Sequence, residues 1–196
     1  QALWDKAYER FGQVDIWINN AGRSHPMSPV AQFDLEIARK VVETNLMGVI
    51  HGSRVALAGM RDQGFGALYN MEGLGSDGRQ VPGLAIYGST KRAIAYLTKS
   101  LAMECRGTPL LVGALRPGMV VTDLLTANLD RQSPEWQRTR RIFNILADRV
   151  ERVAPWLADK ILANRKSGVT ISRLTGLKIM WRFLTAPIVR RKVIDD

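Results

Sequence analysis

Tyr87 and Lys91 are the two residues of this chain whose types and spacing could most directly do chemistry. Periodic apolar residues follow them and predict a helix, in which four residues advance the chain by about one turn. The phenol and the ammonium group then share a face. A free tyrosine has a pKa of about 10, and a lysine charge beside it favours the phenolate. Such a pair suits acid–base work on a carbonyl or alcohol oxygen, although a surface tyrosine and lysine would show the same spacing.

Two asparagines and two small residues, an alanine and a glycine, follow the first apolar run of the chain. Residues 14–18 are a strand-like stretch, and residues 19–22 read Asn-Asn-Ala-Gly. The amides can hydrogen-bond neighbouring backbone, and the Ala-Gly surface lets a flat ligand approach closely. This segment is therefore a candidate ligand-binding edge at the end of a buried strand.

Two further segments supply context for the pair. Asn45 lies inside a long helical pattern that begins near Asp34, a good N-cap, and an asparagine within a helix usually has a bonding reason. Residues 110–114 form a short apolar strand that leads to Pro117 and Gly118, which break the chain at the carboxyl end of the strand. Open α/β sheets bind ligands at that end of their strands.

The order of these motifs resembles that of the short-chain dehydrogenase/reductase family over residues 1–125: strand, Asn-Asn-Ala-Gly, helix with Asn45, strand, glycine loop, Tyr-x-x-x-Lys, strand, Pro-Gly-x-x-x-Thr. The resemblance implies an α/β fold with a doubly wound, Rossmann-like parallel sheet. It implies NAD(P)H as cofactor, with NADP favoured over NAD, and reduction of a small-molecule carbonyl to an alcohol. It also implies a homo-oligomer.

The resemblance assigns roles position by position. Tyr87 is implied as the catalytic acid/base, and Lys91 as the residue that binds the nicotinamide ribose and lowers the pKa of the tyrosine. Asn45 is implied to hold the water of a proton relay. The implied cofactor-binding positions are Asn19, Ala21 and Gly22 on the adenosine side, Tyr87 and Lys91 themselves, and Pro117, Gly118, Val120 and Thr122 around the nicotinamide.

The chain departs from the family pattern at its start. The glycine-rich phosphate turn is absent, and the sequence opens without Met in a helical pattern, residues 2–10, capped by Gly12. We therefore expect the first βαβ strands of the fold to be absent from this chain. The charged residue that selects between NAD and NADP cannot be identified in this sequence. A targeting segment cannot be identified in it either.

A second departure concerns the family's catalytic serine, which usually lies about thirteen residues before the tyrosine. Counting back from Tyr87 gives Leu74, and within residues 70–79 only Ser76 offers a hydroxyl. The glycines of this loop could re-route it and present Ser76 as a weak catalytic candidate. The alternative is a loop serine without a role.

The loop itself, Asn-Met-Glu-Gly-Leu-Gly-Ser-Asp-Gly-Arg at 70–79, and the later run 116–125 are similar to segments of chlorophyll b reductases and their bacterial relatives. Those enzymes reduce the C7 formyl group of chlorophyll b, so the resemblance implies a large, apolar carbonyl substrate such as chlorophyll(ide) b. Other aldehydes and ketones, or a carrier-bound acyl group, are alternatives. A non-catalytic dinucleotide-binding sensor and a basic scaffold protein are alternatives of another class.

Basic residues are concentrated at the carboxyl end. The chain carries a formal charge of +10, and residues 138–196 hold 14 Lys and Arg against five acidic residues, a balance of +9. We expect a partial reductase domain over residues 1–172 and a basic extension over 173–196. Leu174, Leu177, Trp181 and Leu184 alternate with basic residues at helical spacing, a pattern that can lie on an anionic membrane or pack on protein with its basic side solvated.

Other classes of function find little support. No helix-turn-helix, zinc spacing or aromatic platform accompanies the charge, so we expect no nucleic-acid partner. The single cysteine and the two separated histidines form no ligand set, so no metal is expected. No stretch is long and apolar enough to cross a bilayer, and we expect a cytoplasmic protein whose tail is its one candidate for membrane contact.

Overall fold

The computed structural model describes residues 1–126, 131, 132, 134 and 136–194. They divide into two compact units, the first comprising residues 1–115 and 164–170 and the second comprising the described residues within 116–163 and 171–194. The helices are α1 (Ala2–Phe11), α2 (Leu35–Val42), α3 (Gly48–Gln63), α4 (Ala85–Glu104), α5 (Asp123–Thr126), α6 (Trp136–Leu146), α7 (Val150–Ala163) and α8 (Gly176–Thr185), with short turns η1 (Val30–Gln32) and η2 (Glu43–Met47). The strands are β1 (Ile16–Asn19), β2 (Gly66–Met71), β3 (Leu110–Arg116), β4 (Val120–Val121), β5 (Asp148–Arg149) and β6 (Thr170–Ser172).

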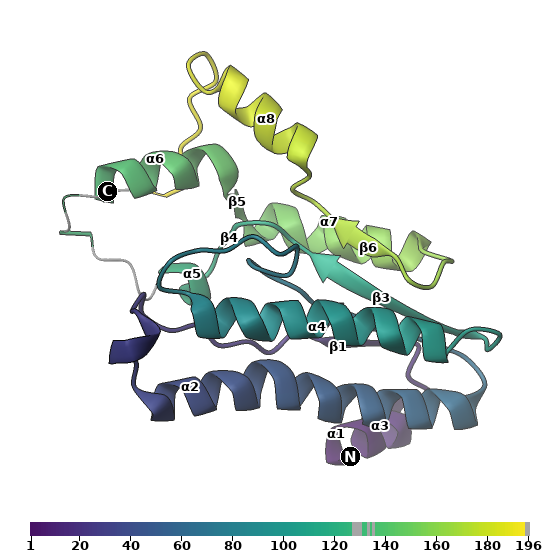
Figure 1. The fold of residues 1–196 in the computed structure, drawn as a ribbon. Coiled ribbons are helices and arrows are strands. Elements are labelled where there is room, and N and C mark those ends of the chain that lie inside the picture. Colours follow the sequence, from purple (N-terminus) through teal and green to yellow (C-terminus); the bar gives the residue numbers. More distant parts are fainter. Residues whose placement is uncertain (127–130, 133, 135, 195–196) are drawn as a thin grey trace. The chain divides into compact units, whose positions relative to one another are not determined.

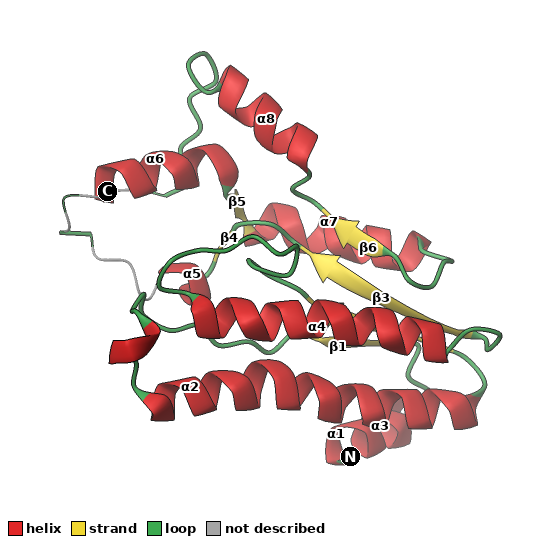
Figure 2. Ribbon diagram, in the orientation of Figure 1, coloured by secondary structure: helices red, strands yellow, loops and turns green. Residues whose placement is uncertain are grey.

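β1, β2 and most of β3 organise the first unit, and they belong to a sheet whose strand order is β1-β2-β3-β6. β1 pairs parallel with β2, Ile16 opposite Ala67, and β2 pairs parallel with β3, Gly66 opposite Leu110. Helical segments connect these parallel strands, as Figure 2 shows with helices in red and strands in yellow. The predicted α/β fold with a parallel, Rossmann-like sheet is thus confirmed.

The helix ends follow the capping residues of the sequence. Gly12 ends α1 in a left-handed conformation with φ 76°, and its N–H donates to the carbonyl of Tyr8. The Asp34 side chain accepts from the N–H of Glu36 at 2.8 Å and begins α2. Both ends were predicted from the sequence, because Gly at a helix C-terminus and Asp at an N-terminus satisfy otherwise unpaired backbone groups.

α2, η2 and α3 form one continuous helical run with a π-helical turn at residues 43–47, and Asn45 lies in that turn. α3 and α4 lie along one face of the strands β1 to β3 (Figure 1). A π turn shifts the side chains that follow it, and such turns are frequent at functional sites. The turn is therefore the first structural sign of where the site lies.

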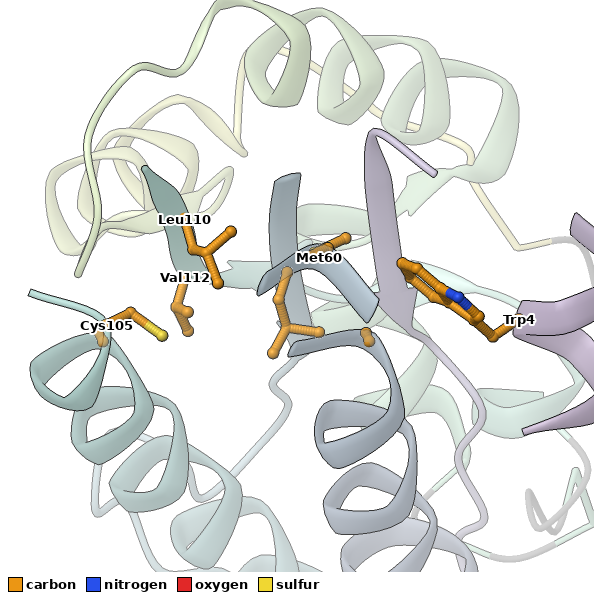
Figure 3. Close-up of a cluster of buried hydrophobic side chains, with 8 residues drawn as sticks. Trp4, Met60, Cys105, Leu110 and Val112 are labelled. Atoms are coloured by element: carbon orange, nitrogen blue, oxygen red, sulfur yellow. The ribbon is translucent and has the colours of Figure 1, made fainter. Parts of the chain in front are cut away.

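The core of the first unit joins α1, α3, α4 and β3. Buried side chains of Trp4, Met60, Cys105, Leu110 and Val112 meet there, with Met60 lying between Trp4 and the others in Figure 3. A Cβ atom at position 59 would lie 2.1 Å from the Trp4 ring, so Gly59 lets α1 pack directly on α3. This packing fixes the helices that carry the polar residues described below.

The second unit contains β4, α5, α6, β5, α7 and α8, and β4 pairs parallel with β5. Trp136, Phe143 and Ile194 form a small apolar cluster with partly buried neighbours around it. Beside it, the buried carboxylate of Asp148 is held by three arginines. Within the described residues, no helix has both the length and the apolar character needed to cross a membrane.

Candidate active site

Tyr87 and Lys91 lie within α4, the 20-residue helix that follows the glycine loop. The lysine Nζ atom lies 5.8 Å from the centroid of the tyrosine ring, so the two side chains share a face as the spacing predicted. The N–H of Tyr87 donates to Nε2 of His25 at 3.2 Å. The first turn of the helix is therefore anchored to the loop that follows β1.

Lys91 is a buried charge of the first unit. Its side chain is buried, with 4% of the residue exposed, and its Nζ atom donates to the carbonyl of Met71 at 3.2 Å. Burial lowers the pKa of the ammonium group to about 8, and the negative charge of Glu72, itself 4% exposed, opposes that change. Burial of a charged group without full compensation is typical of functional sites.

Tyr87 departs from one expectation. The resemblance implies that Lys91 lowers the pKa of the tyrosine, whereas burial raises the pKa of Tyr87 in this structure. The reason is that a phenolate loses its hydration in the protein interior. The ammonium group lies near the face of the ring and does not reverse that direction.

Gly73 occupies the position next to the tyrosine hydroxyl. A Cβ atom at residue 73 would lie 2.6 Å from Oη of Tyr87 and 3.2 Å from Cε of Lys91. Counting thirteen residues back from Tyr87 had indicated Leu74, but Leu74 is 42% exposed. The loop between β2 and α4 thus places a glycine, and no hydroxyl, directly against the catalytic candidate.

Ser76, the only hydroxyl candidate in the loop, lies in a tight turn. Its N–H donates to the carbonyl of Gly73 at 3.1 Å, and its carbonyl accepts from Arg92 Nη1 at 3.0 Å. The residue is 1% exposed, and its Oγ atom has no hydrogen-bond partner among the residues that the structure describes. Gly75, with φ +98°, lies against the backbone of Gly88. A catalytic role for Ser76 stays a prediction.

Asn45 ties the loop after β1 to α4. Its Oδ1 atom accepts from the N–H of Arg23 at 2.7 Å, and its Nδ2 atom donates to the carbonyl of Arg23 at 2.9 Å and to Oγ1 of Thr90 at 3.1 Å. These bonds use three of the four that an asparagine amide can make. The structure therefore shows that Asn45 positions the loop after β1. Its role in holding the water of a proton relay stays a prediction.

The Asn-Asn-Ala-Gly segment is locked by its first residue. Asn19 Nδ2 donates to Asn70 Oδ1 at 2.8 Å and to Ser53 Oγ at 3.1 Å, and its Oδ1 atom accepts from Trp17 Nε1 at 2.9 Å. Ala21 and Gly22 are exposed. A Cβ atom at residue 22 would lie 3.7 Å from both Lys91 Nζ and Asn45 Oδ1. The structure therefore brings Gly22, Asn45, Gly73, Tyr87 and Lys91 together.

The predicted nicotinamide positions Pro117, Gly118, Val120 and Thr122 belong to the second unit. Gly118 has φ +84°, and a Cβ atom there would lie 2.7 Å from that of Leu174. Thr122 is exposed, and its Oγ1 atom donates to the carbonyl of Val120 at 3.4 Å. Their cofactor-binding role stays a prediction.

Sequence reasoning missed three residues of this site. His25, considered in the sequence only as one of two separated histidines, is 2% exposed; its Nδ1 atom lies 2.8 Å from the carbonyl of Pro26 and its ring packs edge-on against Phe33. Glu72 and Gly73 were noticed only as part of an unusual loop. The tight spacing of glycines after β2 was the available signal that backbone and side chains approach closely there.

Comparison with known proteins identifies the family. A family profile described as short chain dehydrogenase matches residues 1–133. The chain belongs to the short-chain dehydrogenase family. Two relatives are chlorophyll(ide) b reductases NOL, chloroplastic, from Oryza sativa subsp. japonica and Arabidopsis thaliana. The first is 37% identical over 194 residues, with 94% of this chain and 55% of the relative covered; the second is 38% identical over 174 residues, with 84% and 49% covered.

Solved structures of short-chain dehydrogenases have a fold similar to that of this chain. The 3-ketoacyl-(acyl-carrier-protein) reductase from Brucella melitensis, complexed with NADH, has a TM-score of 0.75 at 26% identity and covers 90% of this chain and 72% of its own. Levodione reductase has a TM-score of 0.77 at 25% identity, with 90% and 71% covered. ElxO with NADP bound has a TM-score of 0.73 at 26% identity, with 87% and 70% covered. The chain thus spans about half the length of the NOL relatives and more of these structures.

Proposed function

We propose that this chain carries the proton-transfer site of an NAD(P)H-dependent reductase that converts a carbonyl group to an alcohol. The observation that supports the proposal most directly is the convergence of the Tyr87 hydroxyl and the end of Lys91 over Gly73. A phenol beside a buried ammonium group is a proton donor whose conjugate base is stabilised by a fixed charge.

The residues of the chain divide the work. When bound, NAD(P)H supplies the hydride. Tyr87 donates its hydroxyl proton to the substrate oxygen, and the positive charge of Lys91 stabilises the phenolate that remains. Because the pKa of Lys91 is about 8, the ammonium form predominates at pH 7 and is lost above pH 8. We therefore expect the rate of reduction to fall as the pH rises through about 8.

The first unit fits part of a dinucleotide. Ala21 and Gly22 are exposed at the carboxyl end of β1, and a Cβ atom at residue 22 would lie 3.7 Å from Lys91 Nζ. A glycine there leaves room for a ribose, whose hydroxyls the ammonium group could bind. We propose Lys91, Ala21 and Gly22 as cofactor contacts, with Asn19 fixing the end of β1 just before them and the Pro117 to Thr122 segment as the predicted nicotinamide side.

The proposed substrate is a large, apolar aldehyde, and the formyl group of chlorophyll(ide) b is the leading candidate. The names of the NOL relatives support it, at 37% and 38% identity. Other aldehydes, ketones and carrier-bound acyl groups are the alternatives.

The test uses the protein encoded by the complete gene and follows NAD(P)H oxidation with chlorophyllide b and a panel of aldehydes and ketones. Tyr87→Phe should lower the rate by about 10²–10⁴-fold, the usual contribution of a general acid. Tyr96→Phe is the matched control, because Tyr96 lies on the same helix and is 77% exposed. Full activity in Tyr87→Phe would defeat the mechanism, and cofactor binding without turnover of any substrate would favour the sensor.

We propose that any membrane contact of the tail is made by apolar side chains of α8 and not by its basic ones. The basic side of α8 was predicted to face solvent or lipid, but Arg182 is 9% exposed and is paired with Asp148. The apolar side chains Leu177, Trp181 and Leu184 are instead 76%, 63% and 70% exposed. An apolar contact with lipid or protein therefore fits this helix better than an electrostatic one. A homo-oligomer and a cytoplasmic location stay predictions, although the NOL relatives are named as chloroplastic.

A further inference from the structure

Arginines line a groove of the second unit that is formed by α6, α8 and the segment after α8. The groove has a volume of about 410 Å³, in the range of small-molecule sites. Its described lining includes no carboxylate and five arginines, which are Arg140, Arg141, Arg182, Arg190 and Arg191. Gln137, Asn144 and Thr185 add uncharged polar groups.

Two of the arginines are held in fixed positions. Arg182 Nη1 donates to the carbonyl of Leu146 at 2.7 Å, and its Nη2 atom donates to the two oxygens of Asp148 at 3.0 and 2.8 Å. Arg191 Nη2 donates to the carbonyl of Ala147 at 2.7 Å and to Asp148 at 2.6 Å, and its Nη1 atom bonds the carbonyl of Ile145. Residues 145–148 thus orient two guanidinium groups of the groove lining before any ligand arrives.

Around Asp148, the guanidinium groups that the structure describes outnumber the carboxylate. Asp148 is one carboxylate against the guanidinium groups of Arg173, Arg182 and Arg191. Burial and then repulsion by Arg182 lower the pKa of Arg191, and burial followed by repulsion from Arg182 and Arg173 lowers that of Lys178. The cations therefore repel one another, and an anion placed among them would relieve that repulsion.

We propose that this groove binds a compact polyanion, a small molecule that carries two or more phosphate or carboxylate groups. The planar fork of a guanidinium matches both groups with paired hydrogen bonds. Several guanidinium groups around one cavity exceed what a single monoanion could neutralise. The site is separate in chemistry from the Tyr87 pair and does not rest on the proposed reductase function.

The probes are pyrophosphate and citrate, added to the protein at an ionic strength kept constant with sodium chloride. Thermal unfolding is the measurement, so the readout does not depend on activity. At a concentration of about 100 times its dissociation constant, a ligand of the native state should raise the unfolding midpoint by roughly 5–10 °C. A response to pyrophosphate alone would assign phosphate chemistry, a response to citrate alone carboxylate chemistry, and a response to both would assign the shared anionic chemistry.

The variant Arg141→Gln/Arg190→Gln removes two exposed arginines of the groove, which are not the ones that hold Asp148. Its control is Arg54→Gln/Arg106→Gln, which removes the same charge from exposed positions in the first unit. We expect the midpoint shift to fall by at least half in the groove variant and to remain in the control. No shift beyond that of chloride with either probe, or an equal shift in both variants, would overturn the proposal.

Discussion

Lys91 in the first unit and Asp148 in the second are both buried charges, with 4% and 6% of the residue exposed, but their neighbours differ. Lys91 has one backbone carbonyl and the charge of Glu72, and burial lowers its pKa to about 8. Asp148 also suffers burial, yet the hydrogen bond and charge of Arg182 and the charges of Arg191 and Arg173 outweigh it and lower the pKa of the carboxyl.

The comparison separates two uses of a buried charge. An under-compensated charge such as Lys91 costs folding stability, and we infer that it is retained for the reaction. An over-compensated charge such as Asp148 organises structure, because it gathers guanidinium groups from segments far apart in the sequence. If this reading is right, replacing the two residues should move stability in opposite directions.

Asp148→Asn tests the larger effect. The substitution leaves three guanidinium groups without their carboxylate, and breaking a buried ion pair in this way typically costs about 3–5 kcal/mol. We expect the free energy of unfolding in urea to fall by that amount at pH 7. Arg173→Gln should cost less, because Arg182 and Arg191 still hold the carboxylate. A loss below about 1 kcal/mol for Asp148→Asn, on the scale of an exposed pair, would contradict the structural role.

Lys91→Met tests the opposite sign. A shift of the lysine pKa from 10.5 to about 8 corresponds to a destabilisation on the order of 3 kcal/mol, present in full below pH 8. Between pH 8 and 10.5 the unfolded chain keeps the proton that the folded chain has lost, so stability rises with pH. We expect Lys91→Met to raise stability at pH 7, less whatever attraction to Glu72 is lost, and to abolish this rise.

The activity of Lys91→Met provides a second test of the difference between Lys91 and Asp148. Its reductase activity should fall strongly while its unfolding midpoint rises, and urea titrations at pH 7 and pH 10 with parallel assays measure both. Lys99→Met is the matched control, since Lys99 lies on the same helix and is exposed. A Lys91 variant that is both less stable and less active would show that the lysine is a structural residue, like Asp148.

The sequence predicted the elements better than the contacts between them. The resemblance implied the parallel sheet, whereas the cap of α1 at Gly12, the start of α2 at Asp34 and the shared face of Tyr87 and Lys91 follow from local periodicity and capping. The last three features depend on residues within one or two turns of each other. Local patterns are therefore enough to place the catalytic candidate on its helix.

What the sequence did not predict depends on tertiary structure. The position of Gly73 against Tyr87 results from a loop whose path is set by backbone packing between Gly75 and Gly88. The burial of Arg182 results from a partner 34 residues away, so helical spacing alone placed that arginine on a solvated face. Counting residues and reading periodicity cannot supply such distant contacts.

Gly73→Ala probes the geometry around the lysine with a smaller effect. The new methyl group would lie 2.6 Å from Tyr87 Oη, so the phenol or the loop must shift. We expect a loss of stability of about 1–3 kcal/mol from overpacking and a fall in kcat. Gly88→Ala is the control, because its Cβ position is open and alanine is favoured over glycine within a helix by about 0.5–1 kcal/mol. Equal effects of the two variants would remove Gly73 from the site.

Glu72→Gln should have the smallest effect and bears most directly on the charge balance of Lys91. The carboxylate raises the pKa of the lysine against the effect of burial, so its removal should lower that pKa further. The alkaline limb of the pH–rate profile should then move to lower pH, with kcat at pH 6 little changed. Glu9→Gln, an exposed change on α1, should leave the limb in place. An unmoved limb in Glu72→Gln would mean that Glu72, although buried beside the lysine, does not set its charge.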